Sequence, residues 1–129
     1  MTDEAAIRQL QNDYCTYFDA RDAENYANLY TEDCIVVTPW GQEIHGSAKM
    51  AKAVKHTPLG GWHKAGAYKV EISGDDAQGT CRFEAQDLDG SIDEGYYEDR
   101  YRRVGDQWQI AYRRVIVETR DMSAPQRPK

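Results

Sequence analysis

Two residues of this 129-residue chain are suited to general-base chemistry, His63 and Asp19. Histidine titrates at about pH 6.5, so a positioned imidazole can remove a proton at neutral pH. His63 stands at the opening of an alternating segment, in Gly61-Trp62-His63-Lys64. Asp19 ends an apolar helical face, where the negative end of the helix dipole disfavours an anion. A carboxylate there needs a partner, and by accepting a hydrogen bond from one imidazole nitrogen it would raise the basicity of the other.

Both residues also have ordinary structural interpretations. His63 could be a hydrogen-bonded surface histidine, and Asp19 or Asp22 could cap the following helix. Tyr14 lies five residues before Asp19 on the same helix, so the two side chains project about 140° apart. They border one cavity only if its wall wraps around the helix end. The Tyr14 hydroxyl could donate to an enolate oxygen or a departing hydroxyl, or Tyr14 could be a core residue.

Asp99 is a fourth candidate for catalysis. Tyr97, Asp99 and Tyr101 share one face of a predicted strand by period two, which turns Asp99 inward. Its carboxyl could be a protonated hydrogen-bond donor, or it could form an ion pair with Arg113 or Arg114 of the next strand. These two interpretations remain open.

Aromatic composition suits an apolar pocket with polar points, because nine tyrosines and three tryptophans carry a polar tip on a large ring. Candidates for the pocket wall, with core packing as the alternative, are Tyr30, Trp40, Trp62, Tyr97 and Tyr101.

Other chemistries lack support in the sequence. His45, His56 and His63 lack the spacing of a local metal clip, so no metal site is expected. Cofactor motifs such as GxGxxG and GxxxxGK[ST] are missing, and no cofactor is expected. The three cysteines, an odd and widely spaced set, are expected to be small buried residues rather than nucleophiles: Cys15, Cys34 and Cys81.

Charge and hydropathy limit the partners. A net charge of −6 and a pI near 5.0 predict that the chain does not bind nucleic acid, because the average surface repels phosphate. No apolar run is long enough to cross a bilayer, and the first residues lack the pattern of a signal peptide. A cytoplasmic protein without membrane contact is therefore expected.

The elements that position these residues follow from periodicity. Apolar spacings of three and four predict a helix over about residues 4–20. Asp22 can cap a second helix with Tyr26, Leu29 and Tyr30 on its inner face, and Ser47 can cap a third. Strands are predicted over 34–37, 43–45, 62–73, 79–87, 95–104 and 107–119.

This order predicts one α+β domain over residues 1–121, followed by a frayed tail over 122–129. The sheet is expected to curl over the first helix and to leave a cavity between the two. Its convex face is expected to pair two chains into a homodimer, because an open curved sheet seldom leaves its outer apolar residues uncovered.

Over about residues 4–119 the chain resembles the SnoaL-like branch of the NTF2-like superfamily. The resemblance implies a cystatin-like cone, in which three N-terminal helices pack on a curved, mixed but mainly antiparallel sheet. It rests on the order and spacing of Ile7-x-x-Leu10-x-x-x-Tyr14-x-x-x-x-Asp19-x-x-Asp22, Leu29-Tyr30-Thr31-Glu32-Asp33, His63 at a strand opening, Tyr97-x-Asp99-x-Tyr101 and Trp108-x-Ile110.

Within that superfamily, Asp19 and His63 fall at the Asp/His dyad of scytalone dehydratase, bile-acid 7α-dehydratase and hexachlorocyclohexane dehydrochlorinase. Tyr14 is similar to the tyrosine of the bile-acid dehydratase, where the dehydrochlorinase has a lysine. The resemblance thus favours loss of a hydroxyl over loss of chloride.

The resemblance and the residues together predict a cofactor-independent lyase that acts by dehydratase-like elimination. The expected substrate is a small hydrophobic molecule that contains a carbonyl group or is similar to a polyketide, steroid or terpenoid. Two alternatives stay open. The chain could be a small-ligand-binding or assembly module without turnover, or an isomerase or cyclase that uses the same base.

Overall fold

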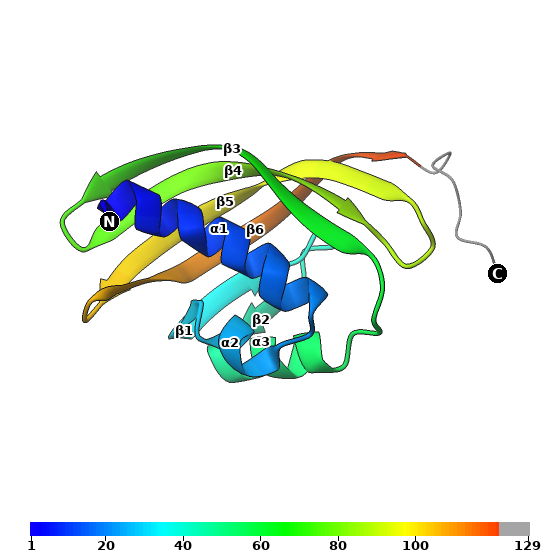
Figure 1. Cartoon of the computed structure of the whole chain (residues 1–129), viewed down its shortest axis with the longest axis horizontal. Coiled ribbons are helices and arrows are strands. Elements are labelled where there is room, and N and C mark those ends of the chain that lie inside the picture. Colours follow the sequence, from blue (N-terminus) through cyan, green and yellow to red (C-terminus); the bar gives the residue numbers. More distant parts are fainter. Residues whose placement is uncertain (122–129) are drawn as a thin grey trace.

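The structure is a computed structural model that describes residues 1–121 (Figure 1). The predicted tail over 122–129 lies outside the described residues. The elements are, in chain order, α1 (Asp3–Asp19), α2 (Ala23–Ala27), β1 (Tyr30–Val37), β2 (Glu43–His45), α3 (Ser47–Lys55), β3 (Trp62–Ser73), β4 (Asp76–Gln86), β5 (Ile92–Val104) and β6 (Gln107–Asp121).

All six strands form one sheet in the order β2-β1-β6-β5-β4-β3. Only the β1–β6 pair is parallel, and the other neighbours are antiparallel. Figure 1 shows the sheet curving over α1, with α2 and α3 beside β1 and β2. The predicted α+β cone with a mixed, mainly antiparallel sheet is confirmed.

The first helix forms where periodicity predicted it. The Thr2 side chain caps the helix by accepting a hydrogen bond from the Ala5 N–H. Its buried face carries Ile7, Leu10 and Tyr14 toward the sheet, at the spacing of an amphipathic helix. Asp19 is the last helical residue, so the geometry of the helix end decides where its carboxylate lies.

Two helix predictions were wrong in detail. The second helix ends at Ala27, because the chain beyond it pairs with β6: the Ile110 N–H donates to the Leu29 carbonyl over 2.7 Å, and Tyr30 lies opposite Ile110. Leu29 and Tyr30 therefore leave the helix. The third helix has Gly46 rather than Ser47 at its N-cap, with no side-chain hydrogen bond there.

The space between α1 and the sheet is packed with aromatic rings instead of being the cavity that the sequence predicted. Tyr14 lies 5.5–5.8 Å, centroid to centroid, from the rings of Phe18, Tyr26, His63 and Tyr97. At such separations the rings touch, so they form the centre of the core.

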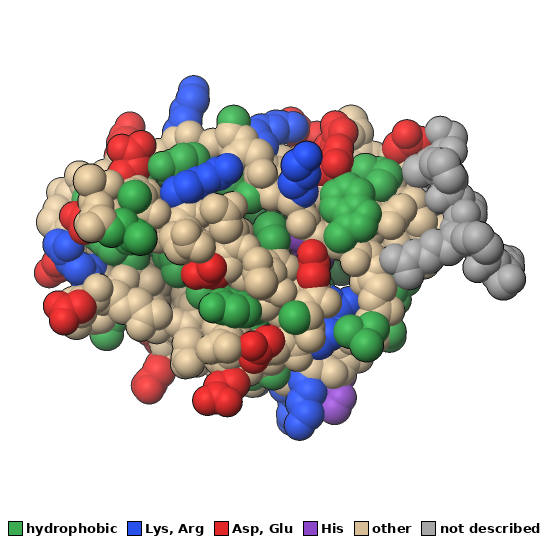
Figure 2. Space-filling model, viewed as in Figure 1, with side chains coloured by type: hydrophobic (Ala, Val, Ile, Leu, Met, Phe, Trp, Pro, Cys, Tyr) green, Lys and Arg blue, Asp and Glu red, His purple; other side chains and the backbone are tan. Residues whose placement is uncertain are grey.

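The outer face of the sheet is grooved and carries both polar and apolar side chains. Two grooves of about 650 and 660 Å³ lie on it, and residues such as Arg100 and Tyr112 line both. Neither groove includes His63 or Asp19. On the face that carries α1, Figure 2 shows acidic and basic side chains interspersed. In residues 1–121 no helix has the length and hydrophobicity to span a membrane.

Candidate active site

His63 and Asp19 meet where the end of α1 approaches the start of β3. Both carboxylate oxygens bind the histidine: Oδ1 lies 2.7 Å from the ring Nδ1, and Oδ2 accepts the backbone N–H of His63 over 3.0 Å. An ionised carboxylate only accepts hydrogen bonds, so the Nδ1 atom carries the proton in this arrangement. The Nε2 atom has no hydrogen-bond partner within residues 1–121.

This pair lies at the rim of the aromatic core. The side chain of His63 is 18% exposed and that of Asp19 is 30% exposed, so solvent and small molecules can reach them. The imidazole packs on Phe18, with ring centroids 4.3 Å apart, and the Tyr14 ring lies edge-on at 5.8 Å. The imidazole is therefore held from one side by a carboxylate and from others by aromatic rings.

A buried ion pair lies deeper between α1 and the sheet. Arg113 of β6 donates from Nε and Nη2 to the two carboxylate oxygens of Asp99, each over 2.8 Å. The same Nη2 donates to Gln11 Oε1 over 2.6 Å, and the Tyr101 hydroxyl donates to Asp99 over 2.7 Å. Gln11 also donates from Nε2 to Asp99 and to the Tyr101 hydroxyl. Asp99 is therefore the acceptor in each hydrogen bond that its side chain forms among the described residues.

These contacts decide between the two interpretations of Asp99. Both of its oxygens accept from Arg113 and one also accepts from Tyr101, so the ion-pair interpretation is confirmed with Arg113 as the partner, and the carboxyl donates no hydrogen bond of the kind that the other interpretation requires. Burial alone would lower the pKa of Arg113, but the Asp99 carboxylate beside it raises that pKa well above its ordinary value. The guanidinium thus stays charged although it is fully buried.

The guanidinium of Arg113 lies between two tyrosine rings. Its central carbon is 3.9 Å from the centroid of Tyr97 and 4.5 Å from that of Tyr14, both within the range of cation–π contacts. Among the described residues its Nη1 is buried without a hydrogen-bond partner. Leaving such a donor unpaired costs about 1–3 kcal/mol, more for a charged group. Such a donor would gain a hydrogen bond if an oxygen atom reached it.

Four phenols surround that guanidinium, those of Tyr14, Tyr26, Tyr30 and Tyr97. The Tyr30 hydroxyl donates to the Tyr26 hydroxyl over 2.9 Å. Burial raises the pKa of all four, and the charge of Arg113 only partly opposes that rise. The phenols are therefore protonated at neutral pH and can donate hydrogen bonds.

The remaining predicted residues do not lie together on one face of the sheet. Tyr30, Tyr97 and Tyr101 belong to the buried inner group. Trp62 directly precedes His63 on β3, so its side chain lies on the opposite face of the strand. Trp40 is 79% exposed, in the turn between β1 and β2. The structure does not bring these two tryptophans together at the His63–Asp19 pair, and their place in a pocket wall stays a prediction.

Sequence reasoning missed two members of the inner group as site residues. Arg113 entered only as an ion-pair partner, and Gln11 did not enter at all. Gln11 is fully buried on the inner face of α1, four residues after Ile7. A polar residue on an otherwise apolar helical stripe is the signal that could have identified it.

Comparison with known proteins supplies the family. The profile of the SnoaL-like domain family matches residues 1–114. No protein with a curated description matches.

Within residues 1–121, no three His, Cys, Asp or Glu side chains are grouped so that they could hold a metal ion.

Three solved structures are similar to this chain in fold. A Mycobacterium tuberculosis protein of unknown function is 26% identical, with a TM-score of 0.79, over 88% of this chain and 70% of its own. A candidate scytalone dehydratase from Novosphingobium aromaticivorans is 20% identical, with a TM-score of 0.82, over 98% and 95%. A hexachlorocyclohexane dehydrochlorinase of type 2 is 16% identical, with a TM-score of 0.83, over 98% and 93%.

Proposed function

Because this chain belongs to the SnoaL-like domain family, whose fold it shares with dehydratase- and dehydrochlorinase-type proteins, we propose that it is a lyase. The proposed reaction is the cofactor-independent elimination of water from a small hydrophobic molecule with a hydroxyl group beta to a carbonyl. The observation that carries the proposal is the His63–Asp19 pair, with Nδ1 bound to a carboxylate and Nε2 without a partner within residues 1–121.

His63 acts as the general base in this proposal. Its Nε2 removes the proton from the carbon next to the carbonyl, and the electrons of that C–H bond form an enolate. Asp19 holds the ring in the required tautomer and stabilises the imidazolium that forms. The enolate then forms the carbon–carbon double bond as the carbon–oxygen bond to the hydroxyl breaks. The imidazolium returns its proton to the leaving hydroxide, so the products are an unsaturated carbonyl compound and water.

Arg113 and Tyr14 stabilise the charge that develops on the carbonyl oxygen. The unpaired Nη1 of Arg113 and the protonated hydroxyl of Tyr14 are donors in a site from which water is excluded. Donors fixed before the reaction contribute about 10²- to 10³-fold each in such a site. Asp99 and Gln11 hold the guanidinium in place and leave Nη1 for the substrate.

A panel of β-hydroxy ketones with a phenyl or alicyclic group tests the proposal. Turnover is followed by the near-ultraviolet absorbance of the conjugated ketone that elimination forms. His63→Ala should lower kcat/KM by about 10²- to 10⁴-fold, the usual contribution of a positioned base.

His45 offers a matched control, because it also pairs with a carboxylate: its Nε2 lies 2.8 Å from Glu43 Oε1. That pair is more than half exposed and lies on β2, so His45→Ala should leave turnover unchanged. Equal turnover by His63→Ala and the unmodified protein on a substrate that the protein eliminates would refute the proposal.

One observation favours the second candidate function, binding without turnover. The rings of Tyr14, Phe18 and Tyr26 touch one another, so a ligand must displace part of this packing before it reaches Arg113. If the bound ligand keeps these rings displaced and leaves slowly without reacting, the chain is a ligand carrier. In that case His63→Ala leaves the ligand affinity unchanged, whereas Tyr14→Ala weakens it.

A further inference from the structure

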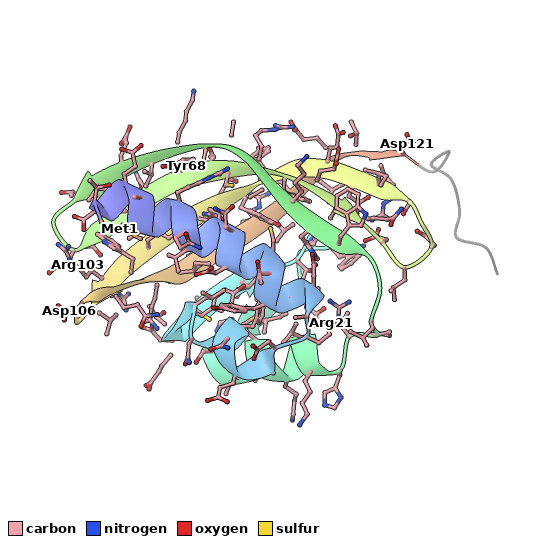
Figure 3. All side chains as sticks on the ribbon, in the orientation of Figure 1. Met1, Arg21, Tyr68, Arg103, Asp106 and Asp121 are labelled. Carbon is pink, nitrogen blue, oxygen red and sulfur yellow. The ribbon has the colours of Figure 1, made fainter. Side chains whose placement is uncertain are left out.

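Arg21 has a backbone conformation that a residue with a side chain seldom adopts. Its φ is 56°, and it is the one non-glycine residue of the described chain with a positive φ. This left-handed conformation costs free energy unless other contacts hold it. Figure 3 shows Arg21 just beyond the end of α1, beside the connection that leads to β3.

The guanidinium of Arg21 joins the end of α1 to that connection. Nη1 donates to the Phe18 carbonyl at the helix end. Nε donates to the Thr57 carbonyl over 3.1 Å, while Nη2 donates to the carbonyls of Pro58 and Gly60 over 2.6 and 3.0 Å. All four acceptors are backbone oxygens. Arg21 therefore fixes the path of the main chain both at the end of α1 and in the connection between α3 and β3.

The connection that Arg21 holds leads directly to His63. Gly60, whose carbonyl Arg21 binds, and Gly61 both have a positive φ, and β3 begins at the next residue, one before the histidine. A second route runs through Phe18: the Arg21 guanidinium lies 5.1 Å from the centroid of its ring, and the same ring packs on His63 at 4.3 Å. Both routes end at the imidazole.

We propose that Arg21 is a positioning residue that holds His63 in register with Asp19. The inference rests on the proposed function, in which the His63–Asp19 pair is the base. Without the guanidinium the connection and the Phe18 ring are released together, and the imidazole leaves the carboxylate for part of the time. Misplacement of a reacting group by about 1 Å can lower a rate by about 10²-fold, so a remote residue of this kind can control turnover.

The test observes the pair directly and needs no substrate. In ¹⁵N-labelled protein, a proton shared between an imidazole and a carboxylate gives a downfield NMR signal, which His63→Ala identifies by removing it. The measured quantity is the rate at which this Nδ1 proton exchanges with solvent. Arg21→Gly keeps the backbone conformation without strain, because glycine adopts positive φ readily. Arg21→Lys keeps the charge but loses the planar fork of donors.

Arg103 supplies the matched control. It too is held by several acceptors, namely Asp3 over 2.9 Å, Asp75 over 3.0 Å and the Gly74 carbonyl. Figure 3 shows it at the opposite end of the molecule. Arg103→Lys therefore removes an equivalent anchor without affecting the connection to His63.

We expect both Arg21 variants to raise the exchange rate of the His63 proton by about tenfold or more, as local opening becomes easier, and Arg103→Lys to leave it within about twofold. In the elimination assay the Arg21 variants should lower kcat and leave KM within about twofold. An exchange rate that stays within about twofold in both folded Arg21 variants would overturn the role of Arg21 alone. Absence of the signal from the unmodified protein would overturn the pair itself, and with it the proposed function.

Discussion

Asp99→Asn removes the charge from the buried partner of Arg113 and preserves the shape of the side chain. In the protein, Asp99 accepts two hydrogen bonds from Arg113, each over 2.8 Å, and one from Tyr101 over 2.7 Å. An asparagine offers one oxygen and one amide group, so a donor of Arg113 or Tyr101 then faces another donor. The guanidinium keeps its charge, fully buried, with Gln11 Oε1 and the single asparagine oxygen left to accept from it where Asp99 offered two charged oxygens.

The expected cost follows from that burial. Breaking a buried ion pair by neutralising one partner costs about 3–5 kcal/mol, a large part of the 5–15 kcal/mol by which a typical domain is stable. The rings of Tyr14 and Tyr97 against the guanidinium offset part of the loss, so we place Asp99→Asn at about 3 kcal/mol. For a domain of this size that corresponds to a fall in Tm of about 10 °C.

Urea unfolding monitored by tyrosine and tryptophan fluorescence measures this difference. Glu98→Gln is the control, because Glu98 is the preceding residue of β5 and forms an exposed pair with Arg114 at 3.5 Å. An exposed pair of this kind contributes little, and the control should change the free energy of unfolding by less than about 0.5 kcal/mol. A loss below about 1 kcal/mol for Asp99→Asn would refute the account of the buried pair.

A double substitution separates stability from function. Replacing both partners with apolar residues, Asp99→Leu with Arg113→Met, removes the charges together and should cost less than Asp99→Asn alone. The same double variant lacks the donor that we assign to the substrate oxygen, so it should be folded, with kcat/KM lowered by about 10²- to 10³-fold. Activity close to that of the unmodified protein would contradict the role of Arg113.

Three further predictions concern thiols, a carboxylate and a turn. Burial raises the pKa of Cys15 to about 11, so about one thiol in ten thousand is ionised at pH 7, and a thiol reagent should label it slowly until urea unfolds the chain. Rapid labelling of the folded protein would contradict this. Burial raises the pKa of Asp87, which means that the folded state holds its proton more tightly than the unfolded state and that the carboxylate destabilises the fold at neutral pH. Asp87→Asn should therefore raise Tm at pH 7, and this gain should fade as the pH falls below the ordinary pKa of aspartate; a gain that persists in acid would be inconsistent. A Cβ on Gly61 would lie 2.2 Å from the Gln86 carbonyl oxygen, whereas a Cβ on Gly74 would meet open space. Thermal unfolding should therefore show that Gly61→Ala loses more stability than Gly74→Ala, for which about 1 kcal/mol is expected. Equal losses of stability would exclude the clash.

The alternation of apolar and polar residues, together with turn residues, predicted the bounds of elements that end at such turns. Residues 62–73 were predicted as a strand and form β3 over the same range, because alternation runs between clear turn residues. The start of β1 was wrong because Tyr30 continues the helical spacing of Tyr26. The parallel partner of Tyr30 is Ile110, eighty residues away, and no local pattern contains that pairing.

The inner face of β6 also depends on strand pairing that the local sequence does not contain. Trp108 and Ile110 are buried, and strict alternation would then turn Tyr112 and Arg114 inward. A register shift between the pairs of Arg100 and Tyr101 leaves one extra residue in β6, so Arg113 is turned inward instead. The sequence therefore left Arg113 and Arg114 as equal partners of Asp99, and the shift decides between them.

The His63–Asp19 contact was predictable because each residue is unusual in its own setting. A carboxylate at a helix C-terminus needs a donor, and a histidine at a strand opening can supply one. The filled interior was not predictable, because packing depends on how five aromatic side chains from different elements meet. Pairing of two chains through the outer sheet face stays a prediction.

Proton abstraction by His63 is the central claim, and deuterium exchange tests it apart from elimination. The probe is a ketone similar to the substrates of the panel but without the leaving hydroxyl, incubated with the protein in D₂O. Mass spectrometry measures the deuterium gained at the carbon next to the carbonyl. The account predicts exchange that His63→Ala abolishes and His45→Ala leaves intact. Elimination of the hydroxylated substrates without any exchange of this probe above the rate in buffer, or exchange that survives in His63→Ala, would contradict it.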